Sequence, residues 1–211
     1  MFTKKFEFND INEKRNYLTK TKEEKYEFLK QLQGELQRFY IELRMKLDHN
    51  ESSQLNQLIS SVRSAMYSIK SIKDIENNID NLNRSSKIIK HDLFILYQKE
   101  IEDLYTNFYA HMYQKENTSV ESLQNLYADI QKKYSTNFSA FYKKAQNAVI
   151  EDIDMTIIIN LNRELYTSNK AMLMAIKDFL LNEKDAEILM KQLHINHKIV
   201  FLKIIKSTRF L

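Results

Sequence analysis

The sequence lacks cysteine, proline and tryptophan, and it holds one glycine in 211 residues. The absence of cysteine excludes disulfide bonds, thiolate metal sites and cysteine nucleophiles. Average composition would give roughly ten prolines and fifteen glycines, so residues that break helices or form tight turns are almost missing. We therefore predict an all-α chain with few irregular segments.

Long apolar runs are missing as well. Apolar runs such as residues 157–159, within MTIIINL, fall far short of the roughly 20 residues that a transmembrane helix needs. The N-terminal segment MFTKKFEFND is too charged to be the apolar core of a secretory signal. No glycine-rich phosphate loop, serine elbow or HExxH motif is present. These absences lead us to expect a cytoplasmic protein that is not an enzyme.

The charge is nearly balanced, with 32 basic and 28 acidic residues and a formal charge of +4. The excess is concentrated in the C-terminal segment KQLHINHKIVFLKIIKSTRFL, which includes Lys198, Lys203 and Lys206. Either this tail packs its apolar side on the rest of the protein, or it lies on the anionic inner face of the cell membrane. No nucleic-acid-binding motif accompanies the charge, so we expect no nucleic-acid partner.

Helix signals recur along the chain. A capping box of Thr21 and Glu24 predicts the start of the first helix, and a second capping box is expected at Thr118 and Glu121 before the fourth. The remaining predicted helices run from about Ser53 to Leu82, from about Ser86 to Gln114, from a turn near NAVIEDID onward, and from near Glu183. Long helices joined by short turns predict an antiparallel up-and-down bundle.

One carboxylate occupies an unusual place in the second predicted helix. Apolar residues spaced alternately three and four apart from Leu55 to Ile72 form a predicted buried seam, and Glu76 falls on the same seam. Burying an unpaired carboxylate costs several kcal/mol. Either Glu76 binds a cation together with Asp80, which lies about 40° away on the same helix face, or it pairs with Lys73 or faces water.

Other polar residues bear on the choice between a cation site and a carboxylate that is paired or exposed. Asp74 points nearly opposite to Glu76, and carboxylates from other helices, among them Glu164, are candidate contributors to a cation site. Serines at 60, 64, 68 and 71 line one side of the second predicted helix. They either face solvent or let a neighbouring helix approach closely.

The stretch SVRSAMYSIKSIKDIENNIDNL resembles the motif helix of PhoU proteins, whose metal-binding signature is an acid, an apolar residue, a glutamate and, four residues later, an aspartate. Asp74, Ile75, Glu76 and Asp80 match these four positions. The stretch NLNRELYTSNKAMLMAIKDFLL is similar to the second motif helix of the PhoU-like domain at the cytoplasmic end of bacterial sodium/phosphate cotransporters. There Glu164 takes the place of the glutamate, and Ser168 replaces the aspartate.

This resemblance implies a PhoU-like fold of two three-helix units, at residues 21–116 and 117–211, after an N-terminal extension at residues 1–20. It also implies a regulator of phosphate transport or signalling that binds a transition metal such as iron or zinc. Its partner would be a phosphate transporter or the membrane domain of one, and it could form a homodimer. The alternatives are a structural helical module that binds proteins without metal, and a helical protein that binds membrane surfaces.

Overall fold

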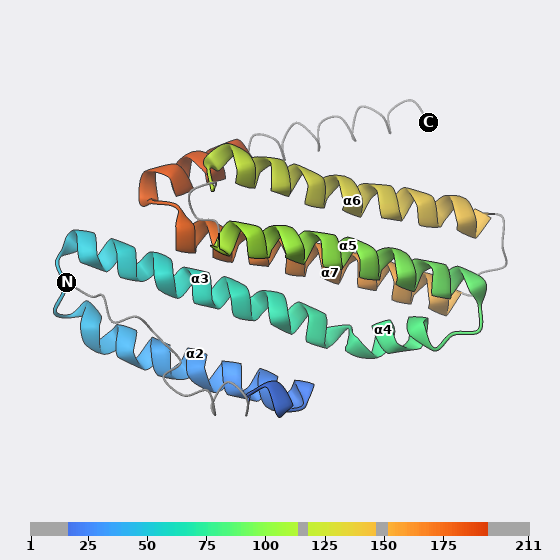
Figure 1. The fold of residues 1–211 in the computed structure, drawn as a ribbon, viewed down its shortest axis with the longest axis horizontal. Helices are drawn as coiled ribbons and strands as arrows, with labels where there is room; N and C mark the ends of the chain where they lie inside the picture. Colours follow the sequence, from blue (N-terminus) through green and yellow to red (C-terminus); the bar gives the residue numbers. More distant parts are fainter. Residues whose placement is uncertain (1–16, 114–117, 147–151, 194–211) are drawn as a thin grey trace. The chain divides into compact units, whose positions relative to one another are not determined.

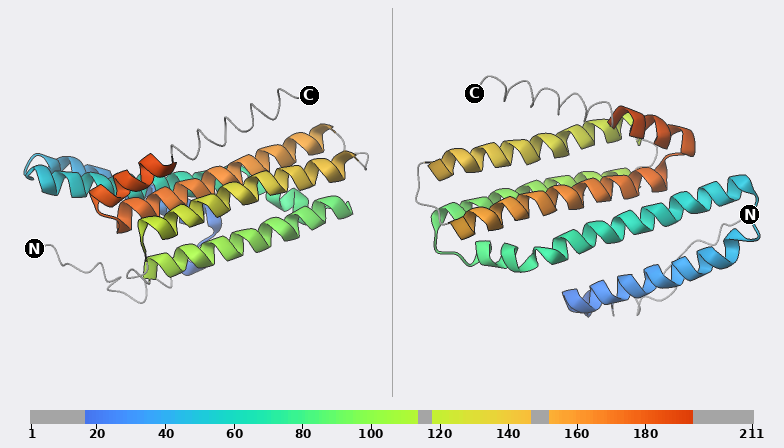
Figure 2. Two further views of the ribbon diagram at one scale, coloured as in Figure 1. Left: turned by 90° about the horizontal axis from the view of Figure 1, so that it is seen from above. Right: turned by 180° about the vertical axis from the view of Figure 1, so that it is seen from behind.

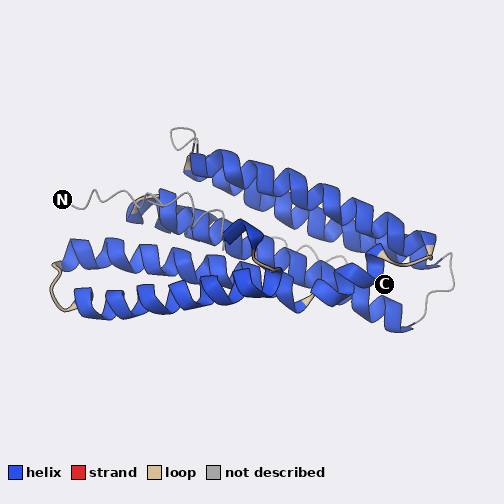
Figure 3. Ribbon diagram, turned by 60° about the horizontal axis from the view of Figure 1, so that its bottom comes forward, coloured by secondary structure: helices blue, strands red, loops and turns tan. Residues whose placement is uncertain are grey.

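The fold is known from a computed structural model that describes residues 17–113, 118–146 and 152–193. Within these ranges the regular structure is helical and contains no strand (Figure 3). The helices are α2 (Lys22–Arg44), α3 (His49–Asp74), α4 (Glu76–Asn83), α5 (Ile88–Tyr113), α6 (Val120–Gln146) and α7 (Asp152–Leu180), followed by a helix at residues 183–193. The prediction of an all-α protein is confirmed for this part of the chain.

The chain forms two compact units, Met1–Lys46 and Leu47–Leu211. The first contains α2, and the second contains α3 to α7 and the helix at residues 183–193. The division that the resemblance implies, between residues 116 and 117, is not a boundary of these units. The two three-helix units therefore stay a prediction.

In the first unit, the predicted start of α2 is confirmed. The backbone N–H of Glu24 donates to Oγ1 of Thr21 at 3.2 Å, and the backbone N–H of Thr21 donates to Oε2 of Glu24 at 2.7 Å. This capping box satisfies two backbone donors that the helix itself leaves unpaired. Although α2 has a regular apolar pattern, none of its residues is buried.

In the second unit, successive long helices run in alternating directions, from α3 through α5 and α6 to α7 (Figures 1 and 2). Helix α7 packs against α3, α4, α5 and α6. The antiparallel bundle is thus confirmed here, with α7 as its central helix. The predicted break between the fourth and fifth helices is also confirmed, because α6 ends at Gln146 and α7 begins at Asp152.

Serines form the contact between α3 and α7. The hydroxyl groups of Ser68 and Ser168 lie 2.9 Å apart, and the Ser168 hydroxyl donates to the backbone carbonyl of Ser68 at 3.0 Å. The Ser61 hydroxyl donates to the carbonyl of Ala175 at 2.8 Å. Ser61, Ser68 and Ser71 are the buried residues of α3. Small side chains let the two helix backbones approach closely, as one of the two interpretations of the serines predicted.

The seam that includes Glu76 is half-buried and not fully buried, since Ile72, Glu76 and Ile79 are all half-buried. The helix predicted from Ser53 to Leu82 is interrupted at Ile75, whose φ and ψ are −110° and 6°, so α3 ends there and α4 begins. Ile75 is completely buried and lies four residues after the buried Ser71, on the same face, while Glu76 is half-buried. Burying the isoleucine in place of the carboxylate avoids the cost of removing a charge from water.

The expected capping box of Thr118 and Glu121 is also wrong. Ser119 and Ser122 hold the first turn of α6, because the Ser122 N–H donates to the Ser119 hydroxyl at 3.1 Å and the Ser119 N–H donates to the Ser122 hydroxyl at 2.9 Å. Thr118 instead binds back to the preceding helix, where its hydroxyl donates to the carbonyl of His111 at 3.2 Å.

The core of the second unit consists of two apolar clusters. One contains Leu104, Phe108, Leu123, Leu173 and Leu189 among others, and it lies toward the helix at residues 183–193. The other lies toward α4 and contains Ile75, Leu82, Leu93, Phe141 and Leu161 among others. The boundary between the two clusters falls between Tyr97 and Leu104 on α5, and between Leu165 and Leu173 on α7.

Candidate functional site

The four acids predicted to bind metal do not form one cluster. Glu76 and Asp80 are half-buried on α4, one turn apart, and Asp74 is exposed at the end of α3. Glu164 lies on α7 and accepts from the Arg163 guanidinium at 3.1 Å. Among the described residues, no group of three or more histidine, cysteine, aspartate or glutamate side chains is placed to hold a metal ion.

A transition-metal centre usually has three or four protein ligands. Glu76 and Asp80 would supply two, and the described part of the chain brings no third to them. Glu76 also interacts with another group of the protein. The residues therefore do not make a complete transition-metal centre within this part of the chain, and the metal stays a prediction.

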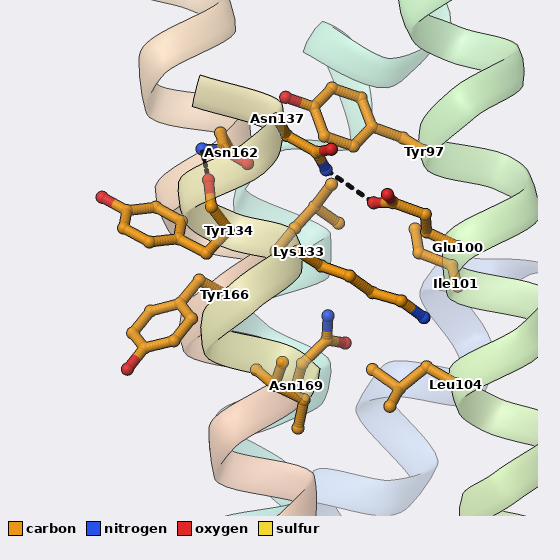
Figure 4. Close-up of a pocket in the computed structure, with 12 residues that line it drawn as sticks. Tyr97, Glu100, Ile101, Leu104, Lys133, Tyr134, Asn137, Asn162, Tyr166 and Asn169 are labelled. Atoms are coloured by element: carbon orange, nitrogen blue, oxygen red, sulfur yellow. Dashed lines mark hydrogen bonds between the residues drawn. The ribbon is translucent and has the colours of Figure 1, made fainter. Parts of the chain in front are cut away.

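A layer of polar side chains lies instead beside the boundary of the two apolar clusters, where α5, α6 and α7 meet (Figure 4). We call it the polar layer and define it as Glu100 of α5, Lys133 and Asn137 of α6, and Asn162 and Asn169 of α7. Asn137 and Asn162 are buried, and the other three are half-buried. The tyrosine Tyr97 borders the layer on the α4 side.

The layer contains a direct polar link between α5 and α6. The side-chain amide of Asn137 donates to Oε2 of Glu100 at 2.5 Å, and the amide of Asn162 donates to the backbone carbonyl of Tyr134 at 3.2 Å. Burial raises the pKa of Glu100, although the bond from Asn137 and the charge of Lys133 act in the opposite direction. Burial and the nearby Glu100 charge raise the pKa of Tyr97 well above its ordinary value.

Two buried polar atoms at the polar layer lack a hydrogen-bond partner, namely the hydroxyl of Tyr97 and Oδ1 of Asn169. Both residues line a cavity of about 30 Å³. Sites for organic ligands usually measure roughly 300–1,000 Å³, so this cavity is too small for one. Its chemistry is that of hydrogen bonding and proton uptake, without an activated nucleophile.

A second candidate site is the apolar face of α2. We define the α2 stripe as Phe28, Leu29, Leu32, Leu36, Phe39 and Leu43, which cover about 100° of the helix circumference. Three of its members remain exposed to solvent by 37–54%, namely Phe28, Leu32 and Phe39. The other three are half-buried. An amphipathic helix with an unburied stripe of this width is typical of a binding element.

Sequence reasoning named Glu76 and missed the polar layer, although a signal for it was present. The apolar positions Tyr134 and Phe141 of α6 are seven residues apart, and 3,4 spacing places Asn137 on the seam between them. An asparagine at a seam position indicates a buried polar partner. The partner could not be named from the spacing, because Glu100 belongs to another helix.

Comparisons with protein-family models, with curated proteins and with solved structures give no match. The resemblance to PhoU proteins is therefore untested, and so are the predicted phosphate-transporter partner, the homodimer and the absence of enzymatic activity. None of the described helices has the length and hydropathy needed to cross a membrane. The basic tail lies outside the described residues, so its contact with the inner leaflet stays a prediction.

Proposed function

We propose that the chain is a helical protein-interaction module that binds a helix of a partner protein through the α2 stripe. The observation that carries this proposal is that α2 has a complete apolar stripe with no buried residue. Most of the stability of a protein helix comes from packing of its apolar face, and α2 has 23 residues of which none is buried. A surface that covers the stripe would therefore stabilise α2.

The chemistry of α2 favours a protein helix as the occupant over a membrane or a nucleic acid. Between Lys22 and Arg44 there are five basic and five acidic residues, so the helix carries no net charge. Helices that lie on anionic membranes or bind nucleic acids are rich in lysine and arginine. The residues Leu29, Leu32, Leu36, Phe39 and Leu43 are spaced alternately three and four apart, which is the spacing of a helix that packs along another helix.

The test replaces two exposed residues of the stripe together, Leu32→Glu and Phe39→Glu. We expect the free energy of unfolding, measured by urea titration and circular dichroism, to change by less than about 0.5 kcal/mol, because neither side chain is part of a buried core. The control is Ile41→Glu, a single change of an apolar residue to glutamate on the opposite face of α2, where the isoleucine is already exposed. A loss of about 2 kcal/mol or more in the double variant would show that the stripe belongs to the folded core, and would overturn the proposal.

Sedimentation equilibrium of the full chain identifies the partner. A dimer that the double variant dissociates and Ile41→Glu does not would make the partner a second copy of this chain. A monomer with unchanged stability in the double variant would make the partner a different protein. A dimer that withstands the double substitution would remove the stripe from the interface and contradict the proposal.

The PhoU-like regulator of phosphate transport is the second candidate function. It is supported by the half-buried pair Glu76 and Asp80, which lie one turn apart on α4, at the positions of the family's acids. In this interpretation the partner helix belongs to a phosphate transporter, and the missing metal ligands come from that partner or from a second copy. The regulation would then act through the same interaction module.

Elemental analysis of the full chain, purified without chelator, tests this second candidate. We expect bound iron or zinc that is lost in the double variant Glu76→Gln and Asp80→Asn and retained in Asp103→Asn, a control at an exposed acid of α5. Equal metal content in all three proteins would contradict a metal site at Glu76 and Asp80. This result would leave the α2 stripe unaffected, because the two experiments probe different helices.

A further inference from the structure

We propose that an apolar pocket between α4, α5 and α7 binds a small uncharged aromatic molecule. The pocket has a volume of about 260 Å³. The buried leucines that line it are Leu82 of α4 and Leu161 and Leu165 of α7. The half-buried Ile79 of α4 and Ile101 of α5 also line it. All five side chains are hydrocarbon, so they offer water no hydrogen bonds, and an apolar ligand that replaces water here is favoured.

The volume of the pocket sets the size of the ligand. A cavity of about 150 Å³ with walls of leucine, isoleucine and phenylalanine binds benzene. Sites for drug-sized molecules start at roughly 300 Å³. A pocket of about 260 Å³ lies between these two sizes, so it suits one ring or two fused rings, such as those of indole. A peptide or a nucleotide is too large for it.

Two aromatic side chains of the pocket favour a ring as the ligand. Phe94 and Tyr97 of α5 both line it, and Tyr97 is buried. Aromatic rings that meet in offset-stacked or edge-to-face arrangements attract each other by more than their buried area accounts for. An aromatic ligand therefore gains more from this pocket than an aliphatic ligand of the same volume.

The polar residues of the pocket determine the charge of the ligand. Gln98 and Glu102 line the pocket and are exposed, so it meets solvent beside them. They lie one turn apart on α5, where Nε2 of Gln98 donates to Oε1 of Glu102 at 3.0 Å. The carboxylate disfavours an anionic ligand, and the apolar walls disfavour a charge of either sign because that charge would have to leave water. An uncharged ring fits both conditions.

The pocket does not depend on the function proposed for the α2 stripe. Its residues belong to α4, α5 and α7 in the second compact unit, whereas α2 belongs to the first. Failure of the small-ligand proposal would leave the α2 stripe unaffected, and the reverse also holds.

Titration of the full chain with indole, followed by saturation-transfer NMR, tests the proposal. We expect a dissociation constant of about 1 mM or tighter, which is reasonable for a ligand of this size. Ile79→Trp brings the same ring into the pocket as a side chain, and it should weaken indole binding by about tenfold or more because both rings cannot share the space. The matched control is Ile88→Trp, at an exposed isoleucine of α5 outside the pocket, and it should bind indole as the original protein does.

Ile79→Phe fills less of the pocket, so its affinity for indole should lie between those of the original protein and Ile79→Trp. It keeps the test valid if circular dichroism shows that Ile79→Trp does not fold. No binding of indole to the original protein, or equal binding by all variants at Ile79, would overturn the proposal. Loss of indole binding in the double variant Leu32→Glu and Phe39→Glu would place the probe on the α2 stripe, with the same consequence. A dimer that Ile79→Trp alone dissociates would assign the pocket to a side chain of a second copy, and the proposal would be wrong.

Discussion

The contact between Ser68 and Ser168 gives the sharpest prediction of stability. Each of these side chains is completely buried. The Ser168 hydroxyl donates to the backbone carbonyl of Ser68, so the hydroxyl of Ser68 is the donor in the bond between the two hydroxyls. Ser168→Ala therefore removes two hydrogen bonds and leaves the Ser68 hydroxyl without its acceptor. Ser68→Ala removes one bond and leaves the Ser168 hydroxyl paired.

The magnitudes follow from these bonds. Each hydrogen bond contributes about 1 kcal/mol, so Ser168→Ala should cost about 2 kcal/mol and Ser68→Ala about 1 kcal/mol. The higher helix propensity of alanine offsets up to about 0.5 kcal/mol of this loss in stability at each site. The double variant leaves neither hydroxyl unpaired, and it should cost less than the sum of the single variants. We expect a coupling energy of about 1 kcal/mol.

The original protein, the two single variants and the double variant form a double-mutant cycle. Urea unfolding followed by circular dichroism gives the free energy of unfolding of each, since the chain has no tryptophan for a fluorescence measurement. An unchanged dependence on urea would show that the same surface is exposed in each case. Ser139→Ala is the control at an exposed serine of α6, whose hydroxyl donates only within its own helix, to the carbonyl of Ser135 at 2.9 Å. Equal costs for the two single variants, with a coupling energy below about 0.3 kcal/mol, would refute the close packing of α3 on α7.

Two further predictions concern the buried carboxylate of Asp154 and the half-buried carboxylate of Glu100. Although burial alone would raise the pKa of Asp154, its bonds to Lys90 and Lys87 hold that pKa below its ordinary value. The pairing of Asp154 therefore stabilises the fold above the ordinary aspartate pKa of about 3.9, and this stabilisation is lost as the pH falls. Asp154→Asn should lower the free energy of unfolding by about 1–3 kcal/mol at pH 7, as measured by urea unfolding. Burial raises the pKa of Glu100, so ionisation of this residue destabilises the fold as the pH rises through the raised pKa. Glu100→Gln keeps an acceptor for Asn137. The free energy of unfolding of this variant minus that of the original protein should increase from pH 4 to pH 7. A difference that stays the same over this range would contradict burial of the charge.

The helical class and several helix ends could be predicted from local chemistry. The near absence of proline and glycine predicts long helices, and the pair Thr21 and Glu24 fixes the start of α2 because its bonds form within one turn. The N-cap of α6 was misassigned by one residue, since Thr118, Ser119 and Ser122 all offer hydroxyl groups. Local sequence does not decide among them, because His111 on the preceding helix binds Thr118.

The sequence of α3 alone could not decide which of its faces is buried, although one interpretation of its serines included Ser68 and Ser71. Spacing favoured the apolar seam that includes Leu58, but Leu58 is exposed and Ser61, Ser68 and Ser71 are buried. The deciding factor is α7, whose Ser168 and Ala175 sit opposite the serines and allow close approach. Such complementarity between two helices about one hundred residues apart in the sequence is not visible in either helix alone.

The polar layer could not be predicted either, because it also depends on contacts between helices that are far apart in the sequence. The bond between Asn137 and Glu100 joins residues 37 positions apart, and the unpaired atoms of Tyr97 and Asn169 become apparent only when α5 and α7 are packed together. Spacing identifies Asn137 as a polar residue at an apolar position. It does not show that the neighbouring helices supply a carboxylate and a small cavity beside it.

Hydrogen exchange of the full chain, measured at a concentration where sedimentation shows a monomer, tests the central claim most directly. If the α2 stripe awaits a partner helix, amide protons between Lys22 and Arg44 will exchange far faster than those of α7, whose contacts with four other helices bury it. Protection of α2 equal to that of α7 in the monomer would show that the stripe is already covered within the chain, and would contradict its role as a binding surface.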